Sequence, residues 1–166
     1  MGSYKVIFVS RFLSILTLAL VAIGLLGCGG QSKSGGGQSA PKPLTNAEYG
    51  AKLKAYAQEF QSSVQTSRAK IQGASGPAGK AAGLGEFRTE FEKLATQLDG
   101  LEPPAVAKTA HDSLVGTLRK GGADIGVVQD AVRTSDRTKA QTGLQALQAD
   151  NTQIQSALTD LQAKVK

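Results

Sequence analysis

The chain has 166 residues, and its 19 Lys and Arg exceed its 13 Asp and Glu, which gives a formal net charge of +6 at pH 7. The basic residues are scattered and interleaved with acids, so no basic stripe of the kind that follows a phosphate backbone is present. We therefore expect no nucleic-acid partner. The single cysteine excludes an intramolecular disulfide, and the abundance of alanine and leucine favours helices over sheets.

The first residues have the pattern of an export signal. Lys5 and Arg11 precede an almost wholly apolar run from Phe12 to Gly24, and the small residue Gly27 follows. A basic start, an apolar core of about 7–15 residues and a small residue at its end are typical of a secretory signal peptide. We therefore expect residues 1–27 to be a signal peptide.

This signal ends on Leu25-Leu26-Gly27-Cys28, which contains the only cysteine of the chain. The ending resembles the bacterial lipobox. The resemblance implies that Cys28 carries a diacylglycerol on its thiol, that a peptidase cuts before it, and that the lipid holds the protein on the extracytoplasmic face of the cell membrane. The alternatives are secretion without an anchor and an uncleaved membrane helix, which would need about 20 apolar residues and is interrupted by Arg11.

Residues 28–43 consist mainly of Gly, Ser, Gln, Lys and Pro and contain no large apolar residue. Such a segment buries too little surface to offset the entropy lost on ordering. We expect it to be a flexible tether that holds the domain of residues 44–166 roughly 20 Å from the bilayer. A segment that binds the cell wall is the alternative.

The first amphipathic segment begins at a capping box, Thr45-Asn46-Ala47-Glu48, in which the side chains of Thr45 and Glu48 satisfy each other's backbone amides. It is expected to end at Gly73. Its apolar residues recur at helical steps. They are Tyr49, Leu53, Tyr56, Phe60, Val64 and Ile71.

The second segment is expected to form a helix from Lys80 to Asp99, after a loop that contains Gly76-Pro77. Gly100 is its expected C-terminal cap. Its stripe is Leu84, Phe87, Phe91, Leu94 and Leu98. Because the aromatic residues of the domain lie in these first two segments, we expect this half of the domain to be the better packed.

The third segment begins near Pro104. Gly121-Gly122 is a possible break, but the apolar phase continues across it from Leu118 to Ile125 and Val132. We therefore favour one long helix over two shorter ones.

The fourth segment follows Thr134-Ser135, which are good N-cap residue types. Its heptad seam contains one polar member, Asn151, which either fixes the register from a buried position or remains hydrated. The seam is Ala140, Leu144, Leu147, Asn151, Ile154, Leu158, Leu161 and Val165.

Four long helices with short connections predict an all-α domain, an antiparallel up-down-up-down four-helix bundle. The alternative is a three-helix packing with the last helix exchanged into a partner chain.

No group of residues predicts catalysis, a metal site or a cofactor. His111 stands beside Asp112, but adjacent helical residues do not face each other, so we expect a structural histidine at the boundary of the core. The glutamates Glu86, Glu90 and Glu92 lack the Glu-x-x-His pattern of a bundle metal site and are expected to form a solvated face.

The corner Leu101-Glu102-Pro103-Pro104-Ala105, followed by Ala110-His111-Asp112 and Leu114, resembles small exported helical lipoproteins of high-GC Gram-positive bacteria. The resemblance covers about half of the residues after Cys28 and implies no enzymatic activity. We therefore expect a non-catalytic binding or spacer module of the cell envelope, whose partners are the membrane, through the lipid on Cys28, and an envelope protein or a wall polymer. The alternative is a carrier of a small ligand, with room for it opened by Gly121-Gly122.

Overall fold

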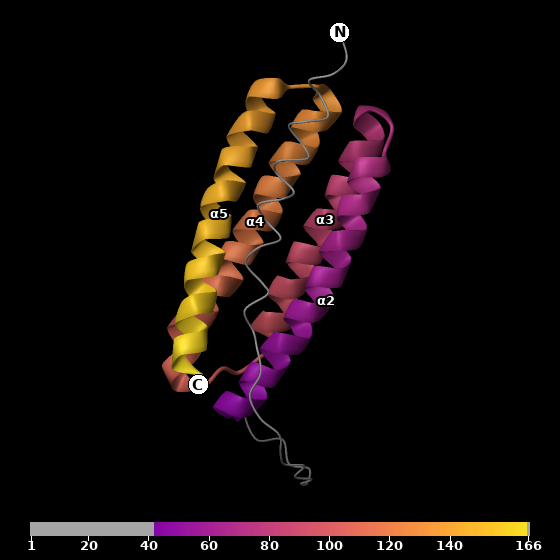
Figure 1. Cartoon of the computed structure of the whole chain (residues 1–166). Helices are drawn as coiled ribbons and strands as arrows, with labels where there is room; N and C mark the ends of the chain where they lie inside the picture. The colour runs from indigo at the N-terminus through magenta and orange to yellow at the C-terminus, as the bar shows by residue number, and fades with distance from the viewer. Residues whose placement is uncertain (1–41, 166) are drawn as a thin grey trace.

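The computed structural model describes residues 42–165, so the expected signal peptide and nearly all of the expected tether lie outside it. These residues form four α-helices and one short 3-10 helix, and no strand occurs among them. The elements in chain order are α2 (Asn46–Gly73), α3 (Gly76–Asp99), η1 (Ala105–Ala107), α4 (Lys108–Thr134) and α5 (Arg137–Lys164). Successive long helices run antiparallel (Figure 1), which confirms the predicted up-down-up-down four-helix bundle.

The predicted capping box at the start of α2 is present. The Glu48 amide donates to Thr45 Oγ1 at 3.3 Å, and the Thr45 amide donates to Glu48 Oε2 at 2.9 Å. The hydrogen bond from the Thr45 backbone lowers the pKa of Glu48. Within residues 42–165, no helix is long and apolar enough to cross a membrane.

Three helix boundaries differ from the prediction. The third segment, expected to begin near Pro104, starts with the 3-10 helix η1, and α4 itself begins at Lys108. Helix α3 begins at Gly76, not at Lys80, because Pro77 is tolerated in a first turn, where its missing N–H has no partner to lose. Gly76 itself has φ +73°, which glycine adopts without strain and which allows the short turn from α2.

At the start of α5 the expected caps, Thr134-Ser135, belong instead to the end of α4. Ser135 adopts a left-handed conformation with φ 58° and ends α4. Asp136 caps α5 by accepting the Lys139 amide at 2.9 Å. Helix α4 itself continues through Gly121-Gly122, so the prediction of one long helix is confirmed.

The helices are not packed equally. The closely packed pairs among them are α2–α3, α3–α4 and α4–α5. Figure 1 accordingly shows α2 and α5 at opposite edges, with α3 and α4 between them. Each edge helix therefore has one close neighbour, and each inner helix has two.

Burial follows this arrangement. Helix α4 buries eleven of its 27 residues, whereas α2 buries five of its 28. The rings of Phe60, Phe87 and Phe91 do pack edge to face, with Phe91 5.1 Å from each of the other two. The expectation that the aromatic half is the better packed is nevertheless wrong for α2, because the most extensive core lies along α4.

Helix α5 is rotated relative to its predicted seam. Gly143, Asp150 and Ala157, seven residues apart, are buried together with Leu147, Asn151 and Leu161. The other large seam members stay only partly buried, and they are Leu144, Ile154, Leu158 and Val165. The small residue Gly143 explains the rotation, since a Cβ built there would lie 2.7 Å from Val128 Cγ2 of α4. The helices therefore meet on the side of α5 that carries small residues.

One end of the bundle joins three helices. The Leu44 amide donates to the Glu102 carbonyl at 2.9 Å, just before η1. Asn46 Nδ2 donates to the Lys164 carbonyl at 3.4 Å, which links the start of α2 to the end of α5. Helix α5 otherwise packs on α4 of its own chain, not in the exchanged arrangement considered as the alternative.

Candidate functional site

The predicted lipid acceptor, Cys28, lies outside the described residues. Its lipidation therefore stays a prediction, and the site residues considered below come from the bundle.

His111 is buried rather than at the boundary of the core, with 3% of its surface exposed. Its Nδ1 lies 2.8 Å from the hydroxyl of Tyr49, so α2 and α4 are joined by a hydrogen bond at this end. Burial lowers the pKa of His111 and raises that of Tyr49, which keeps both groups neutral. Asp112 points elsewhere and pairs with Lys108 at 3.1 Å. The structural interpretation of His111 holds, but the residue forms part of the core.

The glutamates of α3 form a solvated face, as expected. Glu86 pairs with Lys70 at 2.6 Å and Glu92 pairs with Arg88 at 2.7 Å, with all four side chains about half exposed. Among the residues that the structure describes, no group of three or more His, Cys, Asp or Glu side chains is placed to hold a metal ion.

The paired glycines of α4 face side chains of α3. A Cβ built at Gly121 would lie 3.1 Å from Cε1 of Phe91, and one built at Gly122 would lie 3.4 Å from Cγ of Glu92. The space that these glycines leave is thus filled by the Phe91 ring and the Glu92 stem. The expectation that Gly121-Gly122 opens room for a ligand is wrong, because the glycines serve close helix packing.

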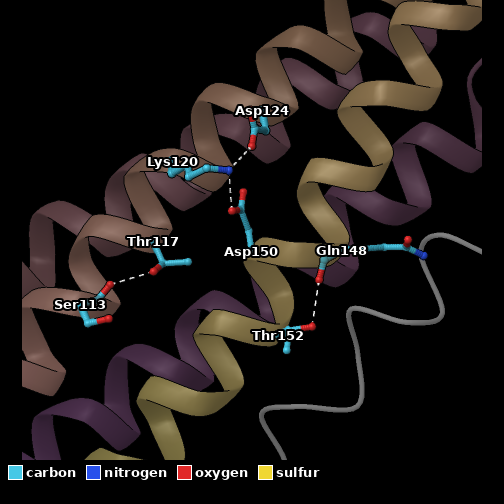
Figure 2. Close-up of polar contacts among 7 residues, drawn as sticks. All are labelled: Ser113, Thr117, Lys120, Asp124, Gln148, Asp150 and Thr152. Atoms are coloured by element: carbon cyan, nitrogen blue, oxygen red, sulfur yellow. Dashed lines mark hydrogen bonds and ion pairs between the residues drawn. The ribbon is translucent and has the colours of Figure 1, made fainter.

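The most unusual group of charged side chains lies where α4 meets α5. Lys120 Nζ is 2.7 Å from Asp124 Oδ2 on its own helix and 2.7 Å from Asp150 Oδ1 on α5 (Figure 2). We call these three residues the Asp150 cluster. Two carboxylates share one ammonium group, so the fully ionised cluster carries one net negative charge.

Asp150 is the buried member of this cluster. Its side chain is 2% exposed, against 20% for Asp124 and 53% for Lys120. Asp150 Oδ2 has no hydrogen-bond partner among the described residues. Burial raises the pKa of Asp150; the bond from Lys120 opposes that rise, and the nearby Asp124 adds to it. Burial dominates, because one oxygen of the carboxylate is left unpaired.

Sequence reasoning missed Asp150 because it stands outside the heptad seam of large residues. Its seven-residue spacing from Gly143 and Ala157 was the available signal, since three small or short side chains in phase mark a face that a neighbour can approach closely. The buried Asn151 follows it directly, with 8% of its surface exposed.

The neighbouring hydroxyls are satisfied within their own helices. Thr117 Oγ1 donates to the Ser113 carbonyl at 2.8 Å, and Thr152 Oγ1 donates to the Gln148 carbonyl at 3.2 Å (Figure 2). They contribute no hydrogen bond to Asp150 among the described residues, so this carboxylate depends on Lys120.

Comparisons of the chain with protein-family models, with curated proteins and with solved structures give no significant match in any of the three.

Proposed function

We propose that this chain is an exported lipoprotein, anchored in the cell membrane through a lipid on Cys28, whose bundle is a non-catalytic binding module of the cell envelope. The N-terminal sequence supports the anchor: a basic start, an apolar run and the lipobox-like Leu25-Leu26-Gly27-Cys28. The resemblance of the Leu101–Ala105 corner to helical lipoproteins agrees with it.

The point at which the tether joins the bundle supports a defined orientation of the bundle relative to the membrane. Leu44 is bonded to Glu102, so residues 28–43 lead to the end formed by the start of α2, η1 and the end of α5. With a tether of roughly 20 Å, this end would face the membrane. The α2–α3 and α4–α5 turns would then point outward.

The observation that carries the binding role is that the two edge helices, α2 and α5, leave apolar side chains partly exposed. In a closed bundle, α2 and α5 would cover each other's apolar side chains, but here they are not a closely packed pair. Five large apolar side chains are left partly exposed on them. They are Leu53 and Tyr56 on α2 and Leu144, Ile154 and Leu158 on α5.

The chemistry of these side chains favours a protein partner over a wall polymer. Apolar residues at helical spacing match the apolar face of another helix, whereas a sugar polymer needs mainly hydrogen-bonding groups. The proposed partner is therefore a helix of another envelope protein. The carrier alternative gains no support, because Phe91 occupies the space beside Gly121.

The anchor is tested by expressing the full gene in a bacterium supplied with labelled palmitate. Wild type is expected to take up the label and Cys28→Ala to take up none. Absence of label in wild type, or equal labelling of the variant, contradicts the anchor.

The binding role is tested by placing a photo-cross-linking residue at Tyr56 or at Ile154 in the full-length protein on intact cells. The control position is Ser113, which is exposed on α4. The same envelope protein should be recovered from the first two positions and not from the third. Failure to recover any reproducible partner, while Cys28 is lipidated and the bundle is folded, overturns the binding role.

A further inference from the structure

The Asp150 cluster holds more negative charge than its surroundings can neutralise. Within residues 42–165, Lys120 is the one cation that bonds either carboxylate, and it bonds both. A carboxylate removed from water needs hydrogen bonds or an opposite charge for each oxygen. Oδ2 of Asp150 has no hydrogen-bond partner among the described residues, and the one ammonium group nearby is bonded to Oδ1 and shared with Asp124.

In the part of the chain that the structure describes, no other charged group stands near enough to compensate. Of the elements packed against α5, helix α4 presents Lys120 and Asp124, and η1 has no charged residue. On α5 itself, the nearest charged residues in sequence are Lys139 and Asp160, ten or more positions away, which is about 15 Å along the helix axis. A bound proton would remove the excess charge and satisfy the free oxygen at once.

We propose that the Asp150 cluster is a proton-binding site that acts as a pH-dependent switch between α4 and α5. With a proton on its free oxygen, Asp150 donates a hydrogen bond to the carboxylate of Asp124 and keeps its bond to Lys120. When that proton leaves to solvent past the partly exposed Asp124, a second negative charge remains in the interface. Helix α5 then separates from α4 more readily.

The direction of the pH effect follows from linkage. Because the pKa of Asp150 is raised in the folded protein, the folded state binds a proton that the unfolded chain has already released. This stabilisation is complete below the ordinary aspartate pKa of 3.8 and is lost as the pH rises through the folded value. Glu48 and Glu59 have lowered pKa values and act in the opposite sense, so the switch is measured as a difference between variants.

The experiment compares thermal unfolding of the whole protein in detergent micelles from pH 4.5 to pH 8, followed by circular dichroism. In Asp150→Asn the amide is neutral at every pH. The melting temperature of this variant minus that of wild type should rise with pH and become positive by a few degrees at pH 8. Asp160→Asn is the matched control, because Asp160 is exposed on the same helix and pairs with Lys164 at 2.9 Å. Its difference from wild type should not rise with pH.

A difference for Asp150→Asn that is negative and independent of pH would overturn the switch and make Asp150 an ordinary ion-pair partner of Lys120. If this variant does not fold, the side-chain carboxyl carbon of Asp150 is titrated by NMR in wild type. Its midpoint should lie at a higher pH than the ordinary aspartate pKa of 3.8. A midpoint at or below that ordinary pKa would overturn the proposal.

Discussion

The inner helices α3 and α4 and the edge helices α2 and α5 all carry apolar stripes in the sequence, yet they bury them to different extents. Helix α4 packs on α3 and on α5, and its Ile125 is fully buried. Helix α5 packs closely on α4 alone, and its Ile154 is only partly buried. The comparison teaches that the burial of an apolar stripe depends on how many helices pack against it. That number cannot be read from the apolar pattern of the helix itself.

Close packing of neighbouring helices on α4 depends on glycines. Gly121 and Gly122 admit side chains of α3, and Gly143 admits Val128 of α4. A glycine inside a helix lowers its stability by about 0.5–1 kcal/mol relative to alanine. The packing that these glycines allow must exceed that loss.

The largest expected effect comes from truncating the same residue type in the two regions. Ile125→Ala should lower the free energy of unfolding by about 2–5 kcal/mol, because it removes fully buried methyl groups and leaves a cavity. Ile154→Ala should cost about 1 kcal/mol, because its side chain is already partly hydrated. Denaturant unfolding of both variants measures the difference. Equal losses would mean that the face of α5 carrying Ile154 is fully covered in solution, against the arrangement described above.

A smaller effect on stability is expected when each of two glycines is replaced by alanine. Gly143→Ala should destabilise the bundle by about 1–3 kcal/mol, because the new methyl group would overlap Val128 between α4 and α5. Gly116→Ala is the matched control on the exposed side of α4, where a Cβ meets nothing within 4 Å. It should stabilise the protein by up to about 1 kcal/mol. Melting temperatures of the two variants should therefore move in opposite directions, and a gain in Gly143→Ala would show that α4 and α5 are farther apart.

The smallest expected effect concerns Asn151. Because Asn151 is buried on α5, with 8% of its surface exposed, Asn151→Leu replaces a polar side chain by an apolar one in the interface and should raise the free energy of unfolding by about 1 kcal/mol. The melting temperature should rise by a few degrees. Asn151 in a seam also specifies register at some cost in stability, so the oligomeric state of the variant is measured alongside. An unchanged or lower melting temperature would indicate that Asn151 is hydrated.

Much of the fold was predictable because its signals are local. The capping box at Thr45 and Glu48, the phase that continues through Gly121-Gly122 and the short connections were enough to predict four antiparallel helices. The boundary errors, at Gly76, at Lys108 and at Ser135, arose where turn geometry selects among several suitable residues. Of the candidate sites, the sequence indicated Cys28 by its neighbours alone, whereas nothing within a few residues of Asp150 distinguishes it from an exposed aspartate.

The sequence by itself determined the helices, their order and the amphipathic faces, because these depend on residues within one or two turns of each other. Only the tertiary structure decided which side of α5 meets α4, and with it the burial of Asp150 beside Lys120 and Asp124. It also decided that His111 bonds to Tyr49 across 62 positions of sequence. The physical reason is that burial and charge pairing are properties of two surfaces in contact. How two helices rotate against each other is settled by the fit of small residues such as Gly143 against Val128, not by the seam of either helix alone.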